Sequence, residues 1–179
     1  MISLMAGDIK SADFTHTAVM DYYARDLVAE TAYHRGWIAS IDFRYRDAFT
    51  FYAKAARLMP SIGVYLNRAG EAAHTLKEYD EAILYYELAL ALDLKESGKD
   101  HSGVVISYSN LALAWEEKKN YGKAIGYYEL ALESTLKAYG EEHSGVSYFR
   151  NNLASMWKAS GDYAKAIKDE GENYDGGNL

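Results

Sequence analysis

The sequence predicts an all-α protein made of antiparallel helix pairs that stack on one another. The first observation is a repeat: the segment that begins at Tyr79 returns 42 residues later at Tyr121, with the same alanines and tyrosines. A third copy opens at Tyr163, and a weaker one begins 34 residues upstream of the first, at Tyr45. The second observation is an apolar stripe at three- and four-residue spacing within each copy. A fixed period of this length indicates one supersecondary unit repeated along the chain.

The composition excludes several classes of function. The chain has 179 residues, of which 49% are hydrophobic and 25% charged, so we expect one folded domain with a sizeable core. Its formal net charge of -7 argues against nucleic acid, since phosphate binding needs a basic face. The absence of cysteine excludes disulfides and thiolate metal sites. The start is a poor signal peptide, and no apolar run reaches the roughly 18 residues of a membrane span. We therefore predict a cytoplasmic protein with no membrane contact.

The elements follow in chain order from the repeat. Residues 1–28 form an N-terminal segment whose helix lies outside the repeat pattern, either as a capping helix or as an extension of the next helix. Residues 29–170 form the array, and its four helix pairs are predicted at 29–62, 63–104, 105–146 and, incomplete, 147–170. Residues 171–179 form a flexible tail, because Gly171, Gly176 and Gly177 disfavour helix.

The third pair, 105–146, shows the design of one unit most clearly. Its first helix carries an apolar stripe with small and large residues, namely Val105, Tyr108, Leu111, Ala112 and Trp115. A polar turn follows, and the stripe of the second helix comprises Ala124, Ile125, Tyr128, Ala131, Leu132 and Leu136. Gly140 is placed to end that helix. One such pair cannot bury its own stripes, so each pair needs a neighbour.

The last pair breaks this pattern. After Ile167 an aromatic and an alanine should follow, and instead the chain continues with polar residues and glycines. We therefore expect a short or absent final helix and a partly open apolar layer around Leu153 and Trp157. Such an end is typical of a fragment of a longer protein or of a surface that docks on another chain.

These units resemble the tetratricopeptide repeat family. The residues that carry the resemblance in the two central units are Leu66, Gly70, Tyr79, Ala82, Tyr86, Ala89, Tyr108, Leu111, Ala112, Trp115, Ala124, Tyr128 and Ala131. The spacing of 42 residues and the linker 139–146 are similar to the kinesin-light-chain-like subclass, although the linker pairs here are His101-Ser102 and His143-Ser144 instead of His-Pro. The resemblance covers about residues 29–168. It implies a right-handed α-α superhelix, with the first helix of each pair lining a concave groove.

Nothing in the sequence predicts catalysis, a cofactor or a metal site. Asp100, His101 and Ser102 contain the residue types of a hydrolase triad, but consecutive side chains diverge and cannot form the relay. The similar trio that ends at Ser144 occupies the same place one repeat later, which marks a linker motif. The five histidines have no metal-ligand spacing, and no glycine-rich phosphate loop is present.

The candidate binding residues are polar groups on the first helices of the pairs. The resemblance places these helices along the groove, and the predicted polar contacts are Asn67, Arg68, Asn110, Asn151 and Asn152. Candidate apolar contacts are Ile106 and Tyr148. An asparagine amide can donate to and accept from a peptide backbone at once. The alternative is that Asn110 and Asn152 only bridge adjacent helices.

We therefore predict a non-catalytic scaffold or adaptor that binds a protein or peptide segment in its groove. The carboxylate clamp of chaperone-binding relatives is not favoured, because Arg68 and Arg150 lack the paired lysines. One alternative is a self-assembling scaffold, a homo-oligomer that pairs through the C-terminal repeat. Another is a sensor or targeting module of a larger enzyme or regulator.

Overall fold

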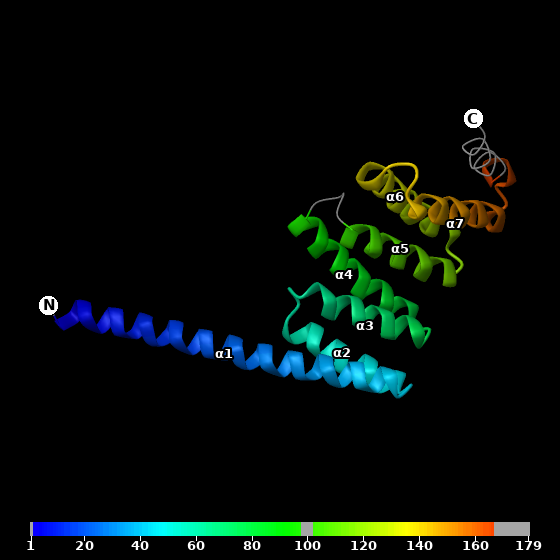
Figure 1. Ribbon diagram of the computed structural model, residues 1–179. Coiled ribbons are helices and arrows are strands. Elements are labelled where there is room, and N and C mark those ends of the chain that lie inside the picture. Colours follow the sequence, from blue (N-terminus) through cyan, green and yellow to red (C-terminus); the bar gives the residue numbers. More distant parts are fainter. Residues whose placement is uncertain (1, 98–101, 167–179) are drawn as a thin grey trace. The chain divides into compact units, whose positions relative to one another are not determined.

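The computed structural model describes residues 2–97 and 102–166 and divides the chain into two compact units, Met1–Tyr65 and Leu66–Leu179. All regular secondary structure in the described residues is α-helical, so the all-α prediction is confirmed (Figure 1). None of these helices is long and apolar enough to cross a lipid bilayer. The predicted boundaries of the array and its pairs stay predictions.

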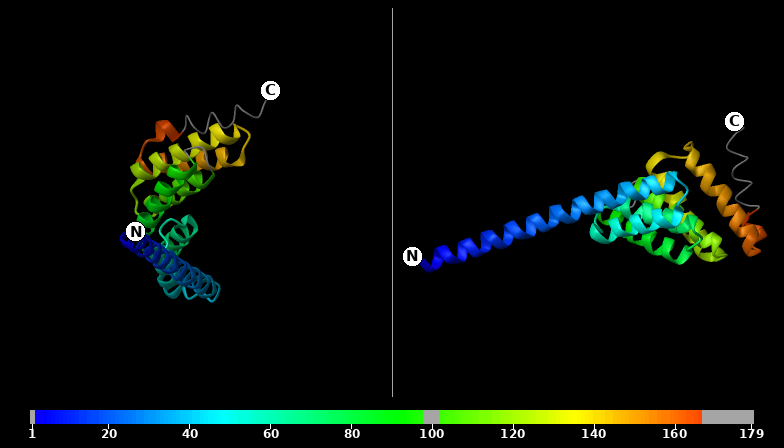
Figure 2. Two further views of the ribbon diagram at one scale, coloured as in Figure 1. Left: turned by 90° about the vertical axis from the view of Figure 1, so that its left-hand side faces the viewer. Right: turned by 90° about the horizontal axis from the view of Figure 1, so that it is seen from below.

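The first unit is a helix pair with one very long member. Helix α1 spans Ile2–Ile41 without a break, and α2 spans Tyr45–Leu58. Residues 1–28 were predicted as a capping helix or as an extension of the next helix, and their described part is the extension, one helix with the residues that follow. Both figures show α1 extending well beyond the end of α2 (Figure 2).

Small side chains let α1 approach α2 closely. The buried small residues of α1 are Ala29, Ala32, Gly36 and Ala39. A Cβ atom built on Gly36 would lie 2.7 Å from the Tyr52 ring of α2. The Tyr33 ring packs beside the same tyrosine, with 5.7 Å between the ring centroids.

The second unit alternates first and second helices of the repeated pair. The first helices are α3 (Gly63–Thr75), which starts just before the unit boundary, α5 (Ser102–Glu117) and α7 (Ser144–Ser160). The second helices are α4 (Tyr79–Ser97) and α6 (Tyr121–Tyr139). From α4 onwards each helix packs against the next one in the chain. Gly140 follows α6 with φ of 80°, as predicted for its C-terminal stop.

The core of the second unit forms where α5, α6 and α7 meet. Its buried members combine small and aromatic residues, namely Val104, Tyr108, Ala112, Ala124, Tyr128, Ala131, Phe149, Leu153 and Met156. Tyr128 is completely buried, and its hydroxyl donates to the Glu116 carboxylate at 3.0 Å. Leu153 is 1% exposed, so the open layer predicted around this residue is not found there.

The same turn joins the two helices of every pair. One residue of each turn has a left-handed backbone: Phe43, Lys77, Lys119 or Gly161, with φ between 58° and 89°. In the third turn the amide of Lys119 donates to the Glu116 carbonyl and that of Asn120 to the Trp115 carbonyl, at 2.7 and 2.9 Å. These two bonds recur in the other turns and satisfy carbonyls at the end of the first helix.

The fourth turn is complete and a helix begins after it. Asp162 accepts a hydrogen bond from the Lys165 amide, as Asn120 does from the Lys123 amide in the preceding pair. Residues 163–166 are helical. Where this helix ends, and the predicted tail 171–179, lie outside the described residues.

Substitution of two helical glycines by alanine should change stability in opposite directions. A Cβ on Gly70 would lie 2.5 Å from the buried Tyr86 ring, so Gly70→Ala should destabilise the fold by about 1–3 kcal/mol. A Cβ on Gly126 meets nothing within 4 Å, so Gly126→Ala should stabilise by about 0.5–1 kcal/mol through helix propensity alone. Urea unfolding of both variants measures the difference, and a stabilised Gly70→Ala would contradict the close packing.

Burial of Tyr128 should make stability sensitive to alkaline pH. Burial and the neighbouring Glu116 carboxylate raise the pKa of Tyr128 well above its ordinary value of 10.0. The folded chain therefore keeps the phenol proton that the unfolded chain releases, and stability is lost as the pH rises above about 10. Tyr128→Phe should cost about 1 kcal/mol at neutral pH because the hydrogen bond to Glu116 is lost.

The measurement is the free energy of unfolding between about pH 9 and pH 11. Its slope with pH should be shallower for Tyr128→Phe than for the unmodified chain. Tyr163→Phe is the matched control, because Tyr163 is 64% exposed, and it should leave the slope unchanged. Equal slopes for all three chains would show that Tyr128 does not contribute to the pH dependence of stability.

Candidate functional site

The predicted site residues all lie on the first helices of the second unit. Helix α3 carries Asn67 and Arg68, α5 carries Ile106 and Asn110, and α7 carries Tyr148, Asn151 and Asn152. We call this set of surfaces on α3, α5 and α7 the helix-A face. Ile106 and Tyr148 occupy equivalent positions one repeat apart and are 54% and 46% exposed. They are large apolar side chains in contact with solvent.

The asparagine amides on this face have no hydrogen-bond partner among the described residues. The buried Oδ1 of Asn67 and the buried Nδ2 of Asn152 have no hydrogen bond, although both side chains are only half-buried. The half-buried Asn110 amide likewise has no hydrogen bond to another described residue. The alternative role, a hydrogen-bonded bridge to an adjacent helix, is thus not observed for Asn110 or Asn152 among the described residues.

A hollow of about 200 Å³ opens beside Asn110. Its walls come from α3, α4 and α5, and the lining residues are Glu71, His74, Thr75, Tyr86, Asn110 and Leu113. The buried Nε2 of His74 has no partner, while its ring packs edge-on against Tyr79 with 5.4 Å between centroids. Sequence reasoning found Asn110 but not His74, because nothing in the spacing of the histidines shows that three helices meet there.

The lining of the hollow combines the apolar Leu113 and the Tyr86 ring with polar groups. Burial, with a smaller effect of the Glu71 carboxylate, raises the pKa of Tyr86 well above its ordinary value of 10.0, so this phenol stays neutral. Small-molecule sites usually have volumes of about 300–1,000 Å³. This hollow is smaller and open, and its size suits a single side chain of a bound segment.

The basic groups near the helix-A face are already paired with acids. Arg68 Nη1 lies 2.6 Å from a Glu71 carboxylate oxygen. Arg150 of α7 pairs with Glu141, and Lys118, which directly follows α5, pairs with Asp80. An incoming carboxylate would have to compete with these acids, so the face has little capacity to hold a negatively charged group.

The linker histidine has a structural role in the described part of the chain. His143 Nδ1 accepts a hydrogen bond from the Gly145 amide at 3.2 Å, at the N-terminus of α7. Its ring stacks on Tyr139 with 4.6 Å between centroids. His101 is outside the described residues. No group of three or more possible metal ligands occurs among the residues that the structure describes.

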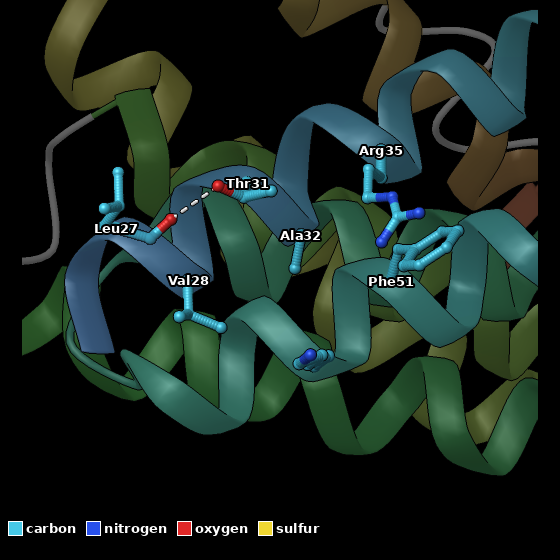
Figure 3. A pocket seen from close by; sticks show the side chains of 7 residues that line it. Leu27, Val28, Thr31, Ala32, Arg35 and Phe51 are labelled. Atoms are coloured by element: carbon cyan, nitrogen blue, oxygen red, sulfur yellow. Dashed lines mark hydrogen bonds between the residues drawn. The ribbon is translucent and has the colours of Figure 1, made fainter. Parts of the chain in front are cut away.

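A second hollow, which sequence reasoning missed, lies within the first unit (Figure 3). It holds about 220 Å³ and is lined by Leu27, Val28, Thr31, Ala32, Arg35, Phe51 and Lys54. The Arg35 guanidinium lies over the Phe51 ring, 5.1 Å from its centroid. Val28 and Thr31 come from α1 and Phe51 from α2, so only the pairing of the two helices reveals this hollow.

Comparison with known proteins supports the fold. Residues 62–137 match the family model of the tetratricopeptide repeat. BtubC (BKLC) from P. vanneervenii superposes with a TM-score of 0.66 at 19% identity, over 84% of this chain and 69% of that chain. A putative kinesin light chain of nearly identical TPR-like repeats from Podosopora anserina gives 0.69 at 16% identity, over 79% and 71%. A search of curated proteins gave no match.

A further solved structure similar to this chain contains a peptide. The first TPR of Spaghetti (RPAP3), bound to the HSP90 peptide SRMEEVD, superposes with a TM-score of 0.60 at 20% identity. The match covers 76% of this chain and 95% of that chain. Together these similarities confirm the predicted class, an all-α fold of stacked helix pairs like those of tetratricopeptide repeats. The 42-residue subclass stays a prediction.

Proposed function

We propose that this protein is a non-catalytic interaction module that binds an extended peptide or partner segment on the helix-A face. The observation that carries the proposal is a set of asparagine amides on α3, α5 and α7 that do not bond to any residue the structure describes. These amides keep hydrogen-bonding capacity that the described part of the protein does not use. A peptide backbone offers both a donor and an acceptor to each amide.

The neighbouring side chains add contacts of a second kind. Ile106 and Tyr148 lie on the same helices and expose apolar surface that a bound segment would cover. The hollow beside Asn110 has room for one side chain of that segment. Amides therefore hold the backbone, while the exposed apolar residues and the hollow select side chains.

The charge of this face favours a neutral or basic segment. The TPR of Spaghetti is bound to an acidic peptide. In this chain Arg68 and Arg150 pair with Glu71 and Glu141, and the chain carries a formal net charge of -7. We therefore expect SRMEEVD to bind more weakly than neutral or basic peptides. Pairing of copies through the C-terminal repeat, a place in a larger enzyme or regulator, and a cytoplasmic location stay predictions.

The double substitution Asn110→Ala with Asn152→Ala tests the role of the amides. The probes are peptides selected on the protein from a random displayed library, with SRMEEVD as the acidic comparison. Fluorescence anisotropy should show at least about tenfold weaker binding of the selected peptides, since each lost hydrogen bond costs about 0.5–1.5 kcal/mol. The melting temperature should change by no more than about 2 °C, because neither amide bonds to a described residue of the protein.

The chain offers a matched control for this variant. Glu87 and Glu129 are also one repeat apart and are exposed on the second helices α4 and α6, so Glu87→Ala with Glu129→Ala should leave binding unchanged. Leu113→Trp, which fills the hollow, should weaken only those peptides whose side chain enters it. A large loss of melting temperature with unchanged peptide binding in the asparagine variant would contradict the proposal.

A further inference from the structure

Helix α1 has a second apolar face that no described element of its unit covers. We call it the α1 seam, and its residues follow a heptad spacing: Met20, Tyr23, Leu27, Glu30, His34, Trp37 and Ile41. At 100° per residue these positions lie on the side of α1 opposite the small residues that pack on α2. The spacing of alternately three and four residues is the pattern of a helix that pairs with another helix along its length.

The apolar residues of the seam are all strongly exposed. Leu27 is 65% exposed, Tyr23 62%, Met20 56%, and both Trp37 and Ile41 54%. Glu30 and His34 separate Leu27 from Trp37, but five large apolar side chains exposed along one helix face are more than monomeric proteins usually leave uncovered without a binding role. The seam from residue 20 to 41 is about 30 Å long at 1.5 Å per residue.

The length of α1 also points to a partner for this face. The first helices α3, α5 and α7 have 13, 16 and 17 residues, whereas α1 has 40. Helices in proteins owe most of their stability to tertiary packing of an apolar face. Between residues 16 and 28, where the side chains of α1 are described before Ala29, none is buried.

We propose that the α1 seam pairs with the seam of a second copy of this chain, as an antiparallel helix pair. The geometry follows from the two ionisable residues of the seam, Glu30 and His34, which lie 3.8 Å apart on one turn of α1 and whose side chains are 58% and 61% exposed. An antiparallel pair aligns a positions with d positions, so Glu30 lies opposite the partner subunit's His34 and, by symmetry, His34 lies opposite the partner subunit's Glu30. The imidazole can donate to the carboxylate whether or not it is protonated.

The same register brings the apolar residues together. Leu27 lies opposite the partner subunit's Trp37, and Tyr23 lies opposite the partner subunit's Ile41. The two-fold axis passes between the central pairs, so the contact is isologous and closes as a dimer. A parallel pair would instead align Glu30 with the partner's Glu30, which places like charges together. The charged residues of two α1 seams therefore complement each other in the antiparallel pair and not in the parallel one.

Leu27→Glu in the full chain tests the interface. Sedimentation equilibrium over a concentration series should show a dimer for the unmodified chain. Two leucines are lost per dimer, so the dissociation constant of Leu27→Glu should rise by at least about 100-fold. Leu84→Glu is the matched control, since Leu84 is 54% exposed on α4, and it should leave the dimer intact. Circular dichroism checks that both variants remain helical.

A charge exchange tests the register. Glu30→Lys alone and His34→Glu alone should each weaken the dimer by about tenfold or more, because the first removes the carboxylate that faces the imidazole and the second places two carboxylates opposite each other. The double variant with both substitutions should return to within about threefold of the original dissociation constant, because a lysine then faces a glutamate. A parallel pair would leave the double variant as weak as the single ones.

Cysteine cross-linking gives an independent measurement, because the chain has no cysteine of its own. Leu27→Cys with Trp37→Cys should form an intermolecular disulfide, whereas Leu27→Cys alone should not. In the antiparallel register the two copies of residue 27 are about 15 Å apart along the axis, beyond the 7 Å reach of a disulfide. A chain that is monomeric at every concentration, or a disulfide formed by Leu27→Cys alone, would overturn the proposal.

Discussion

The structure depends on one repeated contact. In each of the pairs α1/α2, α3/α4 and α5/α6, a tyrosine of the second helix packs against a small residue of the first. Gly36 meets Tyr52 in the first unit and Gly70 meets Tyr86 in the second, each so closely that a Cβ atom would fall within 3 Å of the ring. In the third pair Ala112 and Tyr128 belong to the same buried core. Because the ring fills the place of a side chain, the two helices approach closely and only a short turn can join them.

This packing also decides which residues are left for binding. Arg68, Asn110 and Asn152 each stand two residues before the small residue that faces the second helix. Two residues correspond to about 160° around a helix, which turns these side chains away from the packed pair. The repeated contact therefore produces a repeated polar position. Its chemistry varies because packing does not restrict it: Arg68 binds Glu71, whereas Asn110 has no described partner.

The sequence could predict what the repeat encodes locally and little of what arises between helices. The helix pairs and the stop at Gly140 follow from periodicity and from glycine. The left-handed residue of each turn could be anticipated at Gly161, but not at Lys77 or Lys119, since lysine is no turn signal. Helix α1 continues past residue 28 because no helix breaker stands there. The predicted boundary between residues 28 and 29 came from the repeat pattern alone. The unpaired His74 and the hollow beside Asn110 depend on three helices meeting, which spacing along the chain does not specify.

The two apolar faces of α1 explain why its role could not be read from the repeat pattern. One face carries the small residues that the repeat requires, and the other carries a heptad spacing with its own period. Pairing through the second face would also matter for binding. Two copies joined at α1 carry two helix-A faces, and a partner with two suitable segments would then bind its second segment in an intramolecular step. Amides and a small hollow provide only weak contacts at each face. Two linked faces would still hold such a partner tightly, because avidity raises the overall affinity without any new contact.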